Sequence, residues 1–365
     1  MLRVEDFQCF QDRDGANRIL HRVVFCHGCG LIYTDPWLTS AGRRWLFERA
    51  GRSYGHCDPG ERVAWVMRRC TGVRRVLDLG CGDGLFLRRF PPGIECLGVE
   101  ADTYLGDLAR ATGKIQVIAA DLNDRESWPA ADVITLFHIL EHLDDPSGML
   151  RRLRSRSATG TRLLVEAPIL DRAVETQGPD LCGFFSIAHR THFSRGTLDH
   201  MMAAAGWEVI DRTDLPGNGY RVLARPGKLG KVPMERTAVE EELLKAREYC
   251  RVRGKSVERV IGAVAGYPKG CNLVIWGAGH HTEFLERHTG LFKKFSRYLL
   301  VDRDPLKSGV HIHGIPVVPP DTLDPDFWSA AGVQVLVSSY AWQRVIVQDL
   351  LALNVPRSAI LTLYP

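Results

Sequence analysis

The sequence predicts an α/β protein in which two mainly parallel sheets follow one another along the chain. Short apolar runs alternate with helix-period segments over most of the 365 residues. A strand-like run leads directly into a glycine-rich turn at 76–87, and the pattern of strand, glycine turn and helix recurs at 271–285. Parallel strands need long crossovers, so both regions should form sheets covered by helices.

The composition is that of an ordinary globular protein, with 45% hydrophobic and 25% charged residues. Forty-seven basic and 43 acidic residues leave a net charge of +4, too even to predict a nucleic acid or membrane surface as partner. No apolar run approaches the roughly 20 residues of a membrane span, and no apolar leader follows the first Met. We therefore expect a cytoplasmic protein, whose ten scattered cysteines stay mostly reduced.

The central turn reads Asp78-Leu-Gly-Cys-Gly-Asp-Gly84. Alternating glycines allow strained backbone angles and close approach of a ligand. An acid before the first glycine would repel a pyrophosphate but suits a cationic ligand with a free amino group. A helix should follow directly, with its free N–H groups facing the turn. The next strand ends at Glu100, whose carboxylate can accept both hydroxyls of a ribose.

This D/E-x-G-x-G-x-G pattern resembles the first motif of class I S-adenosylmethionine (SAM)-dependent methyltransferases. The resemblance implies a seven-stranded Rossmann-like domain at 46–227 with SAM as cofactor, and Asp121 as a partner for the adenine amine. An NAD-binding domain, or one without a ligand, is the alternative. The implied cofactor-binding residues are Asp78, Gly80, Cys81, Gly82, Gly84, Glu100, Ala101, Asp121, Leu122, Phe137 and His138.

The N-terminal segment, 1–45, contains Cys26-His-Gly-Cys29-Gly, a spacing typical of a zinc knuckle. It resembles the zinc segment of sugar and small-molecule methyltransferases, which carry another C-x-x-C upstream; here that position reads Asp6-x-x-Cys9. The resemblance implies zinc on Cys9, Cys26 and Cys29. The fourth ligand stays open, and loss of the metal, leaving a small apolar hairpin, is the alternative. Candidates for the fourth ligand are Asp6, His21, His27, His56 and Cys57.

The remaining elements of the first domain follow from periodicity. The stretch 37–70 should be helical. Further strands are expected at 115–118, 132–137 and 161–168, helices at 103–112, 149–155 and 198–205, and a closing antiparallel pair from Trp207 and Tyr220.

Two histidine-containing segments are candidates for the catalytic base. His138-Ile-Leu-Glu-His142 follows the strand 132–137, at the edge where ligands bind in open α/β sheets. His142 is therefore a candidate base, or alternatively a hydrogen-bonded residue at a helix start.

The second segment, His189-Arg-Thr-His192-Phe-Ser194, resembles the Asp-Glu-His-x-x-Tyr-Phe-Ser run of sugar C-methyltransferases, whose histidine is a general base. His189 takes that position, while Ala188 replaces the Glu and His192 the Tyr. Loss of the carboxylate weakens the case for removing a carbon-bound proton, whereas O-methylation needs only a base near a hydroxyl. His189 is the first candidate and His192 the second, with capping of the helix near Ser194 as the alternative for His192.

A linker and long helix, 228–268, lead to a smaller Rossmann-like domain, 269–365. Its Gly277-Ala-Gly-His-His-Thr282 turn and Val301–Gly309 strand end resemble the C-terminal domain of sugar C-methyltransferases and domains that bind nucleotide-linked sugars. His280, His281, Thr282 and Ser338 would then contact a phosphate. A structural domain or a dimer interface is the alternative.

Together these patterns predict a SAM-dependent methyltransferase acting on a small polar acceptor, a sugar or nucleotide-linked sugar, by O- or C-methylation. The acceptor would lie between the two domains of a monomer or homodimer. Two alternatives stay open: a non-catalytic SAM-fold binding or scaffolding protein, and a natural-product O-methyltransferase without a nucleotide-sugar substrate.

Overall fold

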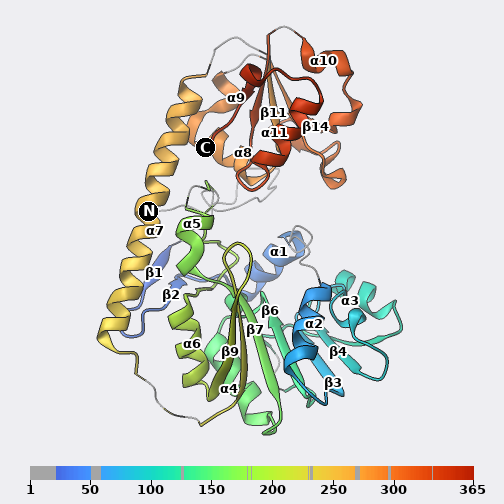
Figure 1. Cartoon of the computed structure of the whole chain (residues 1–365), viewed down its shortest axis with the longest axis vertical. Helices are drawn as coiled ribbons and strands as arrows, with labels where there is room; N and C mark the ends of the chain where they lie inside the picture. The colour runs from blue at the N-terminus through green and yellow to red at the C-terminus, as the bar shows by residue number, and fades with distance from the viewer. Residues whose placement is uncertain are drawn as a thin grey trace. The chain divides into compact units, whose positions relative to one another are not determined.

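The computed structural model of the chain (Figure 1) divides it into two compact units, which we describe separately. Of the described residues, the N-terminal unit comprises those within 22–172 and 187–246, and the C-terminal unit comprises those within 173–186 and 247–365. The structure describes residues 22–50, 59–124, 127–178, 180–181, 183–228, 230, 233–267, 272–294, 297–330 and 332–365.

The N-terminal unit is built on a seven-stranded sheet with the order β5-β4-β3-β6-β7-β10-β9, which confirms the predicted seven-stranded fold. Strands β3 to β7 run parallel, and β10 lies antiparallel to both β7 and β9. The chain leaves β3 toward β4 on one side and later returns to place β6 on the other. The carboxyl ends of β3 and β6 therefore form the switch point where such sheets bind ligands. The strands are β3 (Arg75–Leu79), β4 (Glu95–Glu100), β5 (Ile115–Ala119), β6 (Val133–Phe137), β7 (Arg162–Pro168), β9 (Trp207–Asp214) and β10 (Gly219–Pro226).

Helices cover both faces of this sheet because its side chains alternate between two apolar clusters. Leu77 and Leu136 pack on the face covered by α4 (Pro146–Arg156) and α6 (Arg195–Ala204). Val76 packs on the opposite face with α2 (Pro59–Arg69). Figure 1 shows these helices flanking the strands. The remaining helices of the unit are α1 (Ser40–Ala50) and α3 (Thr103–Arg110).

The prediction of a helix directly after the glycine turn is wrong. The structure has only a single 3₁₀ turn there, η2 (Leu87–Arg89). Pro91 follows at once, and the residue before a proline is driven out of the helical region; Phe90 has φ −67° and ψ 145°. The segment that directly follows the turn therefore supplies no α-helix N-terminus to it.

A small second sheet connects the N-terminal hairpin with the histidine segment. Strands β1 (Val23–Phe25) and β2 (Ile32–Thr34) pair antiparallel, and β8 (Thr191–His192) pairs with β2 so that Ile32 lies opposite His192. Two segments far apart in the sequence thus share one sheet.

The C-terminal unit contains a six-stranded sheet with the order β13-β14-β12-β11-β15-β16, confirming a second Rossmann-like sheet. All neighbours are parallel except β13 and β14. The 30-residue helix α7 (Arg236–Ala265) starts in the N-terminal unit and continues into this one. The other elements are α5 (Ala173–Thr176), β11 (Asn272–Trp276), α8 (His280–Thr289), α9 (Leu291–Lys294), β12 (Arg297–Val301), β13 (His311–Ile312), β14 (Ile315–Val318), α10 (Pro325–Ser329), β15 (Val333–Val337), α11 (Gln343–Ala352) and β16 (Ile360–Leu361). Among the helices that the structure describes, none is long and apolar enough to cross a membrane.

Candidate functional site

The three glycines of the turn after β3 all have positive φ: 81° at Gly80, 54° at Gly82 and 76° at Gly84. A Cβ at Gly80 would lie 2.1 Å from Cδ1 of Ile139, and one at Gly84 would lie 2.5 Å from Cδ1 of Ile115. A Cβ at Gly82 would meet nothing within 4 Å. Packing therefore requires two of the glycines, while the third borders open space from which a ligand can approach the backbone.

Glu100, the last residue of β4, is tied to this turn. Its Oε2 accepts a 2.8 Å hydrogen bond from the amide of Gly82, and its Oε1 accepts one of 2.8 Å from the amide of Asp102. Burial raises the pKa of Glu100, although these backbone hydrogen bonds oppose the rise. Each carboxylate oxygen keeps further acceptor capacity, as a ribose-binding group requires. Ala101 follows and is exposed.

Asp78 lies buried at the switch point, 3% exposed, and accepts a 2.6 Å hydrogen bond from Oγ1 of Thr135. Burial raises the pKa of Asp78 to about 7. A cationic ligand bound beside this carboxyl group would lower the pKa again, because a positive charge favours the ionised form. The thiol of Cys81 is also buried and faces the carbonyl of Gly82 at 3.7 Å. Only the backbone of Cys81 is therefore available to a ligand.

The predicted site residues that follow the neighbouring strands lie near the same edge of the sheet. Oδ1 of Asp121 accepts hydrogen bonds from the backbone and side-chain amides of Asn123, at 2.9 and 3.0 Å. Oδ2 of Asp121 lies 3.6 Å from the guanidinium of Arg43. Leu122 is buried in the core, whereas Phe137 lies under the guanidinium of Arg62 at 4.4 Å.

His138, directly after β6, has a φ of 56°, a conformation that bulky residues adopt where the surroundings impose it. Its amide donates to the carbonyl of Glu166 at 2.9 Å. The ring Nδ1 lies 3.4 Å from Oε1 of Glu141, and Nε2 lies 3.9 Å from Oε2 of Glu166. Burial lowers the pKa of His138, but the two carboxylates outweigh it and the net shift is upward.

A buried ion cluster at Glu166 was not predicted. The Glu166 carboxylate, 1% exposed, accepts a 2.6 Å bond from Nη2 of Arg62 and one of 2.6 Å from Nε of Arg221. Arg221, 2% exposed, also reaches Glu61 at 2.8 Å. The sequence did contain a signal for this cluster, since Glu166 and Arg221 are charged residues inside the apolar runs of β7 and β10. Buried charges require partners, so such residues predict an ion pair.

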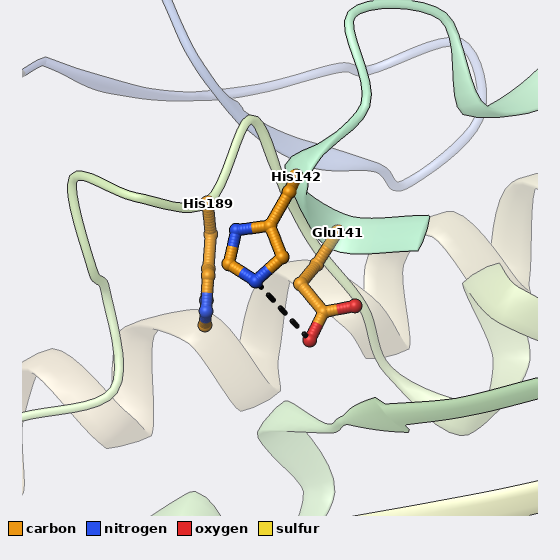
Figure 2. Close-up of side chains that lie close together, drawn as sticks. All are labelled: Glu141, His142 and His189. Carbon is orange, nitrogen blue, oxygen red and sulfur yellow. Dashed lines mark ion pairs between the residues drawn. The ribbon is translucent and has the colours of Figure 1, made fainter. Parts of the chain in front are cut away.

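The structure brings two of the three candidate bases together. Nδ1 of His142 donates a 2.7 Å hydrogen bond to the carbonyl of Ala188, and the ring centroids of His142 and His189 lie 4.9 Å apart. Nε2 of His142 lies 4.0 Å from Oε1 of Glu141, which is 1% exposed (Figure 2). Glu141 lies within the motif 138–142 but is not among the predicted site residues.

His192 has a different environment. It is 2% exposed on β8, with Nε2 3.4 Å from Oγ1 of Thr34, and its ring centroid lies 5.8 Å from that of His189. Helix α6 begins where predicted, but its cap is the Ser194 side chain in a capping box with Thr197. The helix-capping role considered for His192 is therefore wrong.

Cys26 and Cys29 lie at the turn of the β1–β2 hairpin, and both are free thiols. Gly30 has a φ of 71° and donates to the carbonyl of Cys26 at 2.9 Å, as a knuckle requires. Burial raises the pKa of Cys26, but hydrogen bonds to Gly28 and Cys29 outweigh it and the net shift is downward. Burial raises the pKa of Cys29.

The rest of the predicted zinc site is only partly within the described residues. Cys9, Asp6, His21, His56 and Cys57 lie outside them. Within the described residues, no third Cys, His, Asp or Glu side chain completes a metal-ligand group with the two thiols.

In the C-terminal unit, the polar groups expected to contact a phosphate bond one another. His281 is buried between Oγ of Ser338 at 3.0 Å and the hydroxyl of Tyr364 at 2.6 Å. Oγ1 of Thr282 donates to Oγ of Ser338 at 2.7 Å. Burial lowers the pKa of His281 to about 3. The side chain of His280 lies outside the described ones.

The glycine turn of this unit is also engaged. Oδ2 of Asp302 accepts a 2.8 Å bond from the amide of Ala278 and one of 2.9 Å from Nζ of Lys307. A carboxylate on a turn amide opposes an anion there, so these contacts favour a structural role for the turn.

Comparison with known proteins agrees with the N-terminal unit. Residues 47–212 match the family described as "Methyltransferase domain". Ubiquinone biosynthesis O-methyltransferase of Aeromonas salmonicida is 24% identical over 210 residues, covering 52% of this chain and 86% of the relative. That of Vibrio parahaemolyticus is 26% identical over 209 residues, covering 52% and 87%. The solved structure of the mitomycin 7-O-methyltransferase MmcR aligns with a TM-score of 0.43 and 24% identity, covering 50% of this chain and 57% of that one.

The family match, together with the switch-point sheet and its glycine turn, defines the N-terminal unit as a class I methyltransferase domain. The protein is a SAM-dependent methyltransferase, an enzyme whose cofactor is SAM.

Proposed function

We propose that this enzyme transfers the methyl group of SAM to a hydroxyl oxygen of a small polar acceptor, with a sugar or a nucleotide-linked sugar as the expected class. The observation that carries the proposal is the pairing of His142 with His189 beside the carboxyl end of β6. The O-methyltransferase relatives support oxygen over carbon as the methylated atom.

The residues at the edge of the sheet have separate roles in this proposal. Gly82 gives access to the backbone, Glu100 holds the ribose and Asp78 favours the positive charge. SAM supplies an electrophilic methyl group, whose transfer depends mainly on alignment with the nucleophile. His189 takes the hydroxyl proton, and His142, fixed by the Ala188 carbonyl, supports the His189 ring.

The test compares methyl transfer from labelled SAM to a panel of sugar and nucleotide-sugar acceptors in wild type, His189→Ala and His200→Ala. Removal of a general base should lower turnover by roughly 10² to 10⁴ with little change in SAM affinity. His200, on α6 outside the cluster, is the matched control. Unaltered turnover in His189→Ala would exclude His189 from the mechanism.

Calorimetric titration with SAM tests the cofactor site separately. Wild type should bind, and Gly82→Arg should not, because its side chain fills the open space at the turn. Binding without turnover of any acceptor would favour the alternative of a binding or scaffolding protein.

Whether the acceptor is linked to a nucleotide is tested on the full chain by thermal unfolding in the presence of UDP, GDP or TDP. Protection by one of them supports a nucleotide-linked acceptor. If none protects, a natural-product acceptor without a nucleotide becomes the better hypothesis, in line with the bonded polar groups around His281.

A further inference from the structure

We infer that Glu141, His142 and His189 form a binding site for one divalent cation. Each of the three side chains offers a ligand atom, and these atoms all lie within 4.8 Å of one another. Two imidazole nitrogens with one carboxylate are a ligand set suited to first-row divalent ions. The inference rests on the proposed function, because it assigns the ion to the site where the acceptor hydroxyl would bind.

Figure 2 shows the three side chains extending toward the same space, with His142 between His189 and Glu141. Glu141 and His142 come from the 3₁₀ turn η3 (Leu140–His142), directly after β6. His189 comes from the segment just before β8. The ligands therefore come from two segments that the Ala188–His142 hydrogen bond holds together.

The carboxylate of Glu141 is the strongest indication of a missing ligand. Its side chain is 1% exposed, and Oε1 faces His138 at 3.4 Å and His142 at 4.0 Å. Oε2 is buried without a hydrogen-bond partner among the described residues. A buried carboxylate oxygen without a partner is destabilising, and a cation held by both carboxylate oxygens of Glu141 would remove that cost.

His142 is oriented as a metal ligand would be. Its Nδ1 donates to the Ala188 carbonyl, so in the neutral ring Nε2 carries the lone pair and faces Glu141. A metal-bound histidine usually donates its other ring N–H to a backbone carbonyl or a carboxylate, as His142 does here. The 4.0 Å gap from Nε2 to Oε1 is too long for a hydrogen bond. Metal–ligand bonds of about 2.0–2.2 Å can span it after small side-chain movements.

The neighbouring charged groups leave Glu141, His142 and His189 available to bind a cation. Glu166 is paired with Arg62 and Arg221, so it is not free to compete as a ligand. Among the described residues, the cation-forming groups that lie within 4.0 Å of the Glu141 carboxylate are the two histidines His138 and His142. The remaining coordination positions would be open to the acceptor.

The ion would act as a Lewis acid on the acceptor hydroxyl. The hydroxyl oxygen binds the ion and loses its proton to water. This oxygen then forms a bond to the methyl carbon, while the carbon–sulfur bond breaks and its electron pair stays on the sulfur. If the ion is bound, His189 acts as a metal ligand, and water takes the hydroxyl proton in its place.

The experiment is a titration of the full-length, chelator-treated protein with Mn²⁺, followed by electron paramagnetic resonance. Mn²⁺ favours oxygen and nitrogen ligands, so Cys26 and Cys29 should not contribute. Wild type should bind about one equivalent, and Glu141→Gln and His189→Ala should each weaken binding by more than about tenfold. His200→Ala and Glu208→Gln, on an exposed part of β9, should bind as wild type does. Retained SAM binding shows that each variant is folded.

Equal Mn²⁺ binding in wild type and the two cluster variants, or no binding in wild type, would overturn the site. Methyl transfer measured with and without chelator separates this inference from the proposed function. Transfer that persists unchanged in chelator, without Mn²⁺ binding, rejects the metal and keeps the function. Mn²⁺ binding that depends on Glu141 supports the site even if no hydroxyl acceptor is methylated.

Discussion

The hydroxyl of Thr34 donates a 2.9 Å hydrogen bond to the backbone carbonyl of His189, joining residues 155 positions apart in the sequence. The amide of Thr34 bonds the next carbonyl, that of Arg190, at 2.9 Å. The hairpin that carries Cys26 and Cys29 therefore holds the segment that carries the candidate base.

Thr34→Val should loosen this segment while leaving the overall fold intact. The lost hydrogen bond is worth about 0.5–1.5 kcal/mol, so amides in 187–194 should exchange with solvent several-fold faster. Hydrogen exchange followed by mass spectrometry measures this directly. Thr237→Val, at an exposed position of α7, is the control. Unchanged exchange in Thr34→Val would show that the hairpin does not stabilise the segment.

Gly80→Ala and Gly82→Ala should separate folding from cofactor binding. At Gly80 the new methyl group meets Ile139 and the backbone is left-handed, so unfolding free energy should fall by about 2–4 kcal/mol. At Gly82 only the backbone term of about 1–2 kcal/mol applies, but SAM affinity should drop. Urea unfolding and SAM calorimetry give the two readouts. Ile139→Ala should restore part of the stability lost in Gly80→Ala, and failure to do so would contradict the steric explanation.

Asp78 should make stability depend on pH. Burial raises its pKa from the ordinary 3.8 to about 7, so the folded protein holds a proton that the unfolded chain releases between these values. The contribution of Asp78 to unfolding free energy is therefore present at low pH, declines as pH rises through this window, and is level above it. Asp78→Asn should flatten the decline in urea unfolding between pH 5 and 7.5. SAM binding should show the opposite trend in wild type and strengthen as Asp78 ionises, and a pH-independent affinity would argue against contact with the cationic cofactor.

Arg221→Met should be strongly destabilising because it leaves the buried Glu166 with Arg62 as its remaining arginine partner. Breaking a buried pair on one side typically costs about 3–5 kcal/mol. Glu61→Gln removes the half-exposed partner of the same arginine and should cost about 1 kcal/mol or less. Equal effects of the two changes in urea unfolding would show that burial of Glu166 does not dominate the cluster.

We also propose that Cys26 and Cys29, with Cys9, bind zinc as the resemblance of the N-terminal segment implies. Metal analysis of purified protein should find about one zinc that Cys26→Ser removes and that Cys250→Ser, at an exposed cysteine of α7, keeps. Mn²⁺ binding at Glu141 should survive Cys26→Ser. Protein that is purified without zinc would indicate that the hairpin is held by β8 and its own hydrogen bonds alone.

The sheet elements were predictable because each follows from short-range patterns. The apolar runs that end at Leu79, Glu100 and Phe137 became β3, β4 and β6. The helix expected after Gly84 failed because Pro91 and Pro92 leave too few residues before an extended position. Glu166 and Arg221 were missed as a pair because their strands lie side by side only in the folded sheet.

The sequence by itself determined the class of this protein, because the spacing of Asp78 and three glycines between two strands is a local pattern with a local structural consequence. Only the tertiary structure decided which histidines lie together. His142 and His189 are 47 positions apart. The His142 ring donates to the Ala188 carbonyl, and the Thr34 hydroxyl donates to the His189 carbonyl, and these two bonds hold the histidines side by side. Such contacts depend on strand pairing and loop closure across the whole unit, so local sequence patterns do not predict them.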